Sequence, residues 1–376
     1  MLLAIAFACA IGMRFALLPH FTSDYTYGMS AWLETLRTEG FSAFGRHFSD
    51  YNVPYLYLLY LGSLLPLEPL AIVKLIGAIS DLALALGAAA IVLRLGKGRM
   101  VAGFVGIATL FIPEVFLNSA MWGQVDSLYT AFMLWSIWAV LTRRDIAAWV
   151  LFAIAVDVKL QAIFLMPFMA LAFVVQRQRW RVFLYALIPI VLLALPTLIA
   201  GRSLRSLAGV YFYQAGASLG LALDVANPYQ WVPNELYDVV SKAGMFFGVA
   251  VVALLLVLWL RHRSPARDTE VWLLHVATAV MTVVPFILPQ MHDRYFFPAG
   301  ILAAICAVQD RRFLVPAVIM QFTAVVAYAP VLFFIPPFLS YQVLGLIQLV
   351  PVCWIVWLSF APERDRMLPY FAPRTL

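Results

Sequence analysis

Apolar segments long enough to cross a lipid bilayer as helices recur along the whole chain. The hydrocarbon core of a membrane is roughly 30 Å thick, and about 20 helical residues span it. Of the 376 residues, 64% are hydrophobic and only 12% are charged, too few to cover a soluble globule. The sequence therefore predicts an all-α fold: a polytopic bundle of about twelve transmembrane helices, forming a single domain over residues 1–376.

Short basic clusters alternate along the chain with loops rich in proline and aromatic residues. Clusters such as Arg143-Arg144 fall between apolar segments, and the positive-inside rule places such clusters in the cytoplasm. The net charge of +6 therefore reflects topology, and we expect no nucleic-acid partner. Three further arginines, Arg364, Arg366 and Arg374, predict a cytoplasmic tail.

The opposite, extracytoplasmic face receives two long loops in this assignment, residues 20–69 and 201–242. Within the first loop, residues 29–37 have the spacing of a short interfacial helix, and residues 54–65 are apolar but too short to span. We expect the first of these segments to lie at the extracytoplasmic membrane surface and the second to dip into the outer leaflet. The compact loops and the lack of an organelle signal favour the prokaryotic cytoplasmic membrane.

The cysteines predict neither a cross-link nor a metal site, and the N-terminal segment predicts no cleavage. The three cysteines show neither paired nor metal-ligand spacing, so we expect no disulfide and no zinc site. No basic residue precedes the first apolar segment and Arg14 interrupts it, which predicts an uncleaved first helix rather than a signal peptide.

Several charged residues fall at the extracytoplasmic ends of the predicted helices, where an unpaired charge costs several kcal/mol. Two interpretations stay open. Asp157 could pair with Lys159, and Arg294 with Asp293 or with a helix end, so that each contact only anchors a turn. Alternatively the charges converge on one anionic ligand. The set comprises the basic residues Lys74, Lys159 and Arg294 and the acidic residues Asp24, Asp50, Asp126, Asp157 and Asp293.

Two other features have competing interpretations. Asp81, halfway along an apolar segment, could relay protons, or could be a neutral acid bonded to a neighbouring helix or paired with Lys74. The run from Gly216 to Gly220 matches the G-x-S-x-G pattern of hydrolases, but no strand is predicted before it, so we treat the match as chance.

Four segments of the expected extracytoplasmic face, taken together, resemble the polytopic glycosyltransferases of the GT-C superfamily. The likeness is strongest to Gpi18-like mannosyltransferases and more distant to dolichyl-phosphate-glucose-dependent glucosyltransferases. Leu160 and Val53 depart from the family pattern, which often has proline at both positions. The four segments are Ser23-Asp24-Tyr25 with the stretch from Asp50 to Tyr57, Met121 to Ser127, Val158 to Ala162, and Gln290 to Pro298.

The resemblance implies an enzyme that transfers a hexose from a polyprenyl-phosphate donor to a hydroxyl of a glycan, lipid or protein acceptor. It implies that Asp24, in the first loop, is the catalytic base, with Asp50 as a reserve candidate. Residues expected to bind the donor or the sugar are Asp50, Tyr51, Gln124, Asp126, Lys159, His292, Asp293 and Arg294.

Such a reaction requires little from the protein beyond charge and position. Phosphate is a good leaving group, so cations need only stabilise it, while a carboxylate takes the proton of the attacking hydroxyl. A single displacement inverts the anomeric centre. We expect no cofactor, leaving open a divalent cation at Asp24, Asp126 and Asp293.

Two other kinds of protein could share this composition. A transporter or lipid flippase would also have many helices, but such proteins usually contain an internal repeat with polar groups near the midplane, and neither is visible here. A non-catalytic scaffold would show no convergence of charges at one membrane face.

Overall fold

The computed structural model describes residues 1–216, 220–262 and 269–361. Residues 217–219 of the hydrolase-like pattern, Arg364, Arg366 and Arg374 fall outside them. The described chain has sixteen α-helices and one pair of parallel strands, β1 (Ala222–Leu223) and β2 (Met291–His292). The helices are α1 (Leu2–Leu17), α2 (Ser30–Glu39), α3 (Val53–Ser63), α4 (Pro69–Arg94), α5 (Arg99–Leu110), α6 (Pro113–Phe116), α7 (Asp126–Leu141), α8 (Asp145–Val158), α9 (Met166–Gln176), α10 (Val182–Ile199), α11 (Leu204–Gly216), α12 (Tyr237–Arg261), α13 (Thr269–Ile287), α14 (Phe297–Gln309), α15 (Leu314–Phe333) and α16 (Tyr341–Phe360).

Six of these helices are long and apolar enough to cross a membrane: α4, α10, α12, α13, α15 and α16. A seventh span arises if α5 and the helical segment from Pro113 to Trp122, bent by 48°, count as one. The expected number of about twelve is therefore not confirmed. Helices of 16 residues, such as α1 and α7, rise only about 24 Å at 1.5 Å per residue, less than a full membrane core.

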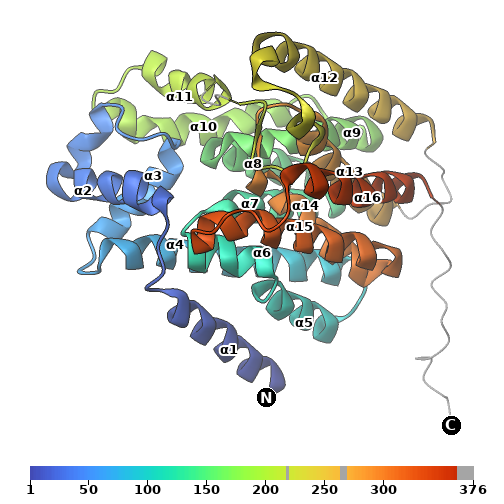
Figure 1. Ribbon diagram of the computed structural model, residues 1–376, viewed down its shortest axis with the longest axis horizontal. Coiled ribbons are helices and arrows are strands. Elements are labelled where there is room, and N and C mark those ends of the chain that lie inside the picture. Colours follow the sequence, from blue (N-terminus) through green and yellow to red (C-terminus); the bar gives the residue numbers. More distant parts are fainter. Residues whose placement is uncertain (217–219, 263–268, 362–376) are drawn as a thin grey trace.

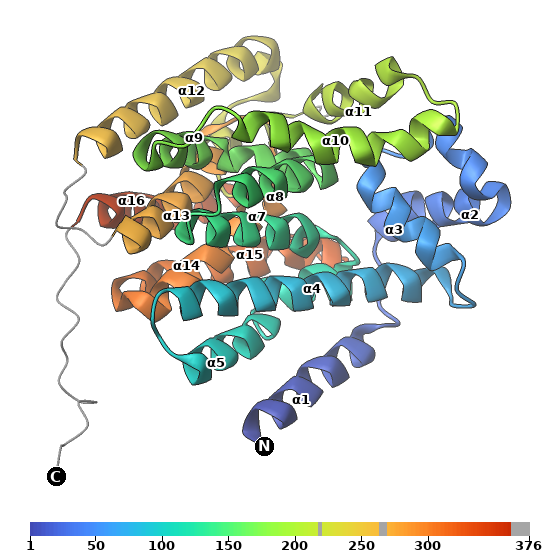
Figure 2. The ribbon, with the colours of Figure 1, turned by 180° about the vertical axis from the view of Figure 1, so that it is seen from behind.

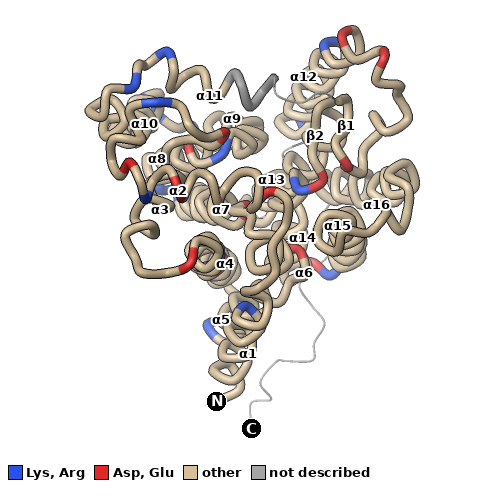
Figure 3. The backbone as a smooth tube through the Cα atoms, turned by 60° about the vertical axis from the view of Figure 1, so that its left-hand side comes forward, with Lys and Arg blue, Asp and Glu red and all other residues tan. Residues whose placement is uncertain are grey.

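The helices differ in how much of their surface the protein covers. In α13, 89% of the apolar window is buried, whereas in α10 and α12 the figure is 17%. Figures 1 and 2 show α10 and α12 along one flank of the bundle and α1 projecting from the opposite flank. Charged residues are sparse over the whole bundle (Figure 3). The exposed apolar faces of α10 and α12 are therefore the surfaces that lipid would cover.

The first long loop folds into a small helical cap with its own core. It contains the two short helices expected from the sequence, α2 and α3, joined by a 3₁₀ turn (Gly40–Gly45). Leu33, Phe44 and Tyr55 form part of a buried cluster there, and Figure 1 shows α2, α3 and α11 at the same end of the molecule. We call this the site end.

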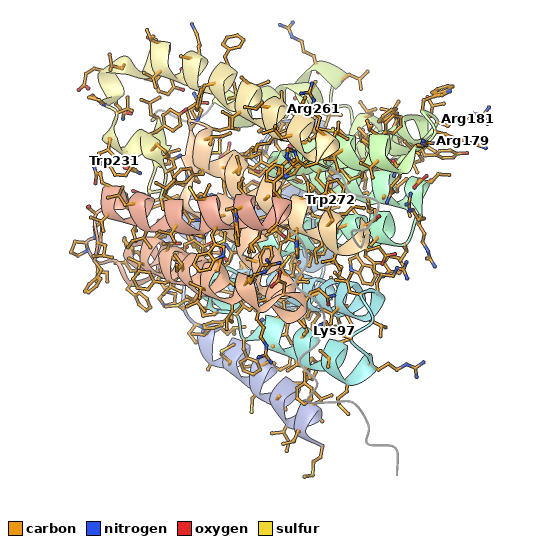
Figure 4. All side chains as sticks on the ribbon, turned by 90° about the vertical axis from the view of Figure 1, so that its right-hand side faces the viewer. Lys97, Arg179, Arg181, Trp231, Arg261 and Trp272 are labelled. Carbon is orange, nitrogen blue, oxygen red and sulfur yellow. The ribbon has the colours of Figure 1, made fainter. Side chains whose placement is uncertain are left out.

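The opposite end of the bundle carries the basic turns. Figure 4 shows Trp231 on one side of the bundle and Lys97, Arg179 and Arg181 on the other. We call the end with these cations the basic end. The second long loop returns to the site end, where β1 pairs in parallel with β2 and Leu223 lies opposite His292. This pairing fixes the His292 segment against the loop.

Candidate functional site

Asp24 lies just after the first helix, at the start of a turn of π-helix (Tyr25–Met29). Its Oδ2 atom accepts hydrogen bonds from Trp122 Nε1 at 3.1 Å and from Gln124 Nε2. Arg294 Nη1 lies 3.5 Å from the same oxygen. The Asp24 side chain is nevertheless 35% exposed, so its carboxylate is oriented by the protein and still open to a ligand.

A buried ion pair joins the second and third of the segments noted in the sequence. Lys159 Nζ donates to Asp126 Oδ1, and both side chains are almost completely buried. Asn118 Nδ2 donates to the other carboxylate oxygen at 2.8 Å. Asp126 begins α7 and Lys159 follows α8, so the pair also locks the ends of these two helices together. Arg294 Nε lies 4.0 Å from Asp126 Oδ2, which connects this pair to the Asp24 group.

Arg294 is therefore the centre of the cluster. Its guanidinium faces both carboxylates and lies 5.4 Å from the ring centroid of Trp122. Arg294 Nε is buried and has no hydrogen-bond partner in the described residues. An unsatisfied buried N–H of a cation is costly, and a bound anion would satisfy it.

The segment from Asn118 to Ser127 carries Trp122, Gln124 and Asp126, and α4 holds it in place. Lys74 Nζ donates to the carbonyl oxygens of Ala120 and Met121 at 2.6 and 2.7 Å. One turn of the segment is a π-helix (Leu117–Trp122), and Gly123 adopts a left-handed conformation with φ of 85°. The bend thus depends on α4 as well as on its own sequence.

Asp81, deeper along α4, holds both ends of the same segment. Its carboxylate accepts from Ser119 Oγ and Ser127 Oγ, each at 2.6 Å. Arg14 of α1 completes the group with two hydrogen bonds of 2.7 and 2.9 Å. The interpretation of Asp81 as bonded to neighbouring helices is thus confirmed, whereas the suggested pairing with Lys74 is wrong.

The local pairing suggested for Asp157 is also wrong. Asp157 accepts a hydrogen bond from Tyr211 of the second long loop, while Lys159 is paired with Asp126. Lys159 follows α8 in an extended conformation, and the two side chains have different partners although they are only two residues apart.

His292 and Asp293 occupy the turn before α14. Burial lowers the pKa of His292 to about 3, and the charges of Arg294 and Lys159 act in the same direction. At neutral pH the ring is therefore uncharged and offers an N–H donor rather than a positive charge. Burial raises the pKa of Asp293 to about 7, against the effect of Arg294, whose backbone N–H donates to Asp293 Oδ1 at 2.8 Å.

Tyr51 connects the cap to this group of residues. Its hydroxyl donates to Gln124 Oε1 at 2.8 Å, and Lys159 Nζ lies 5.5 Å from its ring centroid. Asp50 is exposed. The sequence reasoning did not single out Asn52, which is buried and has no hydrogen-bond partner for either side-chain polar atom within the described chain. The sequence signal for Asn52 was its position as a polar residue directly after Asp50 and Tyr51.

The described residues show no arrangement that favours a bound cation. Among the residues that the structure describes, no three His, Cys, Asp or Glu side chains are grouped to hold a metal ion. Asp24 and Asp126 are instead engaged by cationic and amide donors.

An apolar cavity of about 620 Å³ adjoins the charged cluster. It lies between α9, α12 and α13, and its lining includes Gln161, Met291 and Tyr295. Gln161 Nε2 donates to the Tyr295 hydroxyl at 2.7 Å, and the Tyr295 ring contacts the His292 ring at 5.4 Å. Met245 and Val249 of α12 also line the cavity and are exposed, so it opens on the lipid-facing flank.

The sequence model of glycosyltransferase family 87 matches residues 48–289, well over half of the chain. The chain belongs to glycosyltransferase family 87. This family 87 member is therefore a glycosyltransferase, and the transporter alternative is not favoured. No curated protein matches it.

The family 87 match divides the predicted site residues. Tyr51, Gln124, Asp126 and Lys159 lie within the matched range, whereas Asp24 and the segment from His292 to Arg294 lie outside it. The case for Asp24 and Arg294 therefore rests on their contacts with Gln124 and Asp126.

Proposed function

We propose that this glycosyltransferase transfers a hexose from a polyprenyl-phosphate donor to an acceptor hydroxyl, with inversion at the anomeric carbon. The observation that carries the proposal is that a cationic cluster and an apolar cavity meet at Tyr295 and His292. A donor with a phosphate head and an isoprenoid tail needs both environments side by side. A water-soluble nucleotide sugar would leave the apolar cavity unused.

The leaving phosphate would be stabilised by Arg294, with Lys159 and His292 beside it. As the bond between the anomeric carbon and the phosphate oxygen breaks, the oxygen keeps the electron pair. The unsatisfied Nε of Arg294 is a donor available to that oxygen. A neutral His292 can add a hydrogen bond, and no general acid is needed.

Asp24 would be the general base. The acceptor oxygen attacks the anomeric carbon on the face opposite the phosphate, and its proton passes to the Asp24 carboxylate. Trp122 and Gln124 orient that carboxylate through its Oδ2 atom. Gln124 and Asp126 are also placed to hold sugar hydroxyls or the base, and Asp50 is the reserve base.

The wider assignment follows from the same resemblance. We place the enzyme among the Gpi18-like members of the GT-C superfamily, as one domain over residues 1–376 in a prokaryotic cytoplasmic membrane. The positive-inside rule puts the basic end in the cytoplasm, which supports an extracytoplasmic active site. The acceptor would be a glycan, a lipid or a protein.

The test is transfer by the purified protein in proteoliposomes. Polyprenyl-phosphate hexoses and the matching nucleotide hexoses, radiolabelled in the sugar, are offered with hydroxyl acceptors. We expect labelled product from the lipid donor alone, and its loss in Asp24→Asn but not in Glu34→Gln, a control on the exposed face of α2. Transfer from the nucleotide donor would overturn the donor class, and donor crossing the bilayer without transfer would support a flippase.

A further inference from the structure

A cavity of about 850 Å³ lies at the basic end, between the α7–α8 turn and the α9–α10 turn. We propose that it is a second binding site, for the phosphate headgroup of an anionic phospholipid. The site is remote from the transfer reaction and does not depend on it. Its charged lining consists of one aspartate, Asp145, and five arginines: Arg143, Arg144, Arg177, Arg179 and Arg181.

The protein neutralises only part of the positive charge of this cavity, because Asp145 is the one acidic residue in its lining. All five arginines are exposed, and none forms an ion pair with another described residue. Two other arginines at the basic end are paired, Arg94 with Glu270 and Arg312 with Asp310, whereas Arg99, Arg261 and Arg311 form no ion pair within the described residues. What distinguishes the two neighbouring turns is that their unpaired arginines line one cavity, which the positive-inside rule does not require.

Hydrogen bonds of buried and partly buried side chains tie the two turns together. Gln178 is buried, and its Nε2 donates to Asp145 Oδ1 at 3.1 Å while its Oε1 accepts from Trp149 Nε1 at 2.8 Å. Gln176 Nε2 donates to the Val140 carbonyl oxygen at 3.0 Å. The backbones of the two turns are therefore held at a fixed separation before any ligand arrives, which lowers the entropy cost of gathering their arginines around one ligand.

The surroundings of the cavity favour a lipid over free phosphate. Ile146 and Tyr185 line it and are 46% and 41% exposed. Beyond Tyr185, α10 presents exposed Leu187 and Val191 along the bundle, a surface for acyl chains below the headgroup. Guanidinium groups bind phosphate through paired N–H donors, and basic pockets between transmembrane helices are typical sites for anionic headgroups.

The experiment measures lipid binding to the full-length protein in a non-ionic detergent. The probes are short-chain phosphatidylglycerol, phosphatidylcholine of the same chain length, and inorganic phosphate. We expect phosphatidylglycerol to bind about tenfold or more tightly than either of the others. The triple variant Arg177→Gln, Arg179→Gln, Arg181→Gln should lose about tenfold of that affinity. Its control, Arg99→Gln, Arg261→Gln, Arg311→Gln, removes the same charge at the same end and should lose less than about twofold.

Two results would overturn the proposal. Equal losses of affinity in the two triple variants would mean that phosphatidylglycerol binding depends only on the net charge of the protein. Inorganic phosphate binding as tightly as phosphatidylglycerol would assign the cavity to a soluble phosphate. Should the glutamine variant fail to insert, the variant with lysine at positions 177, 179 and 181 keeps the charge. It should still bind severalfold more weakly, because lysine cannot make the paired contact, and unchanged affinity there would equally refute the site.

Discussion

Arg294 Nη1 lies 3.5 Å from Asp24 Oδ2, although 270 residues separate the two in the chain. The contact brings the segment after the first helix against the turn before α14. It places a candidate base and a candidate phosphate ligand in one group of side chains, with Gln124 and Asp126 between them. Each member of this group can be tested separately.

Asp24→Asn should lower turnover about a hundred- to ten-thousandfold, because the amide cannot take the acceptor proton. Folding should be unaffected, since the amide oxygen can still accept from Trp122 and Gln124. The measurement is kcat for hexose transfer beside the thermal unfolding midpoint. Asp50→Asn is the matched comparison, and a larger loss there than in Asp24→Asn would exchange the two roles.

Lys159→Met should destabilise the protein by about 3–5 kcal/mol, because it leaves Asp126 buried without its closest cation and with only Arg294 at 4.0 Å. The double variant Lys159→Met with Asp126→Asn removes both charges and should regain much of that stability. Transfer activity should stay low in both variants. Thermal unfolding in detergent gives the first quantity and the transfer assay the second. Recovery of activity along with stability would limit this pair to a structural role.

Lys74→Met removes the two hydrogen bonds that hold the backbone of Ala120 and Met121. The side chains of Trp122 and Gln124 should then shift relative to Asp24, and a misplacement of about 1 Å can cost about a hundredfold in rate. We expect kcat to fall by about that factor. Lys97→Met, at the basic end, is the control and should leave kcat unchanged. An equal fall in both would mean that losing any lysine harms the enzyme.

The pH dependence of stability should carry a contribution from His292. Its pKa is about 3 in the folded protein, against an ordinary value of about 6.5 in the unfolded chain. Below pH 6.5 the unfolded chain binds a proton that the folded protein does not, so stability is lost as the pH falls toward 3. His292→Gln should make the unfolding midpoint fall less between pH 7 and pH 5, two values chosen to bracket the ordinary pKa.

Asp293 should contribute with the opposite sign. Its pKa is raised to about 7, so between its ordinary value of about 4 and pH 7 the folded protein holds a proton that the unfolded chain has lost. This contribution weakens the fold as the pH rises. Asp293→Asn should therefore remove a loss of stability on going from pH 5 to pH 7. If the two variants changed the slope of stability against pH in the same direction, relative to the unmodified protein, at least one of the two assignments would be wrong.

Gly300→Ala should destabilise the packing of α14 by about 1–3 kcal/mol. A Cβ at this position would lie 2.4 Å from Glu114 Oε2 and 2.8 Å from Gln321 Nε2, two side chains that are bonded to each other. Gly12→Ala in α1 meets nothing within 4 Å and should instead gain up to about 1 kcal/mol of helix propensity. Thermal unfolding of the two variants in the same detergent compares these effects directly.

The helical class and the two cap helices could be predicted because the length of each apolar segment can be counted in the sequence. The number of spans could not, since proline and polar residues near helix ends shorten α1, α7 and α9 below the usual length. The partners of the buried charged residues were harder to predict than the helices. Asp81 is bonded to Arg14 rather than to Lys74, which is nearer in sequence, because α1 packs against α5 and the turn Leu117–Trp122 and so brings Arg14 to Asp81.

The cavity between α9, α12 and α13 opens sideways, toward lipid rather than water. A ligand that enters through such an opening diffuses in the plane of the membrane instead of through the volume of the solution. The concentration that governs its capture is then its mole fraction among the surrounding lipids. Adding inert phospholipid at constant amounts of enzyme and ligand would lower the mole fraction of that ligand in the membrane and slow the reaction. Its bulk concentration in the sample would hardly have changed.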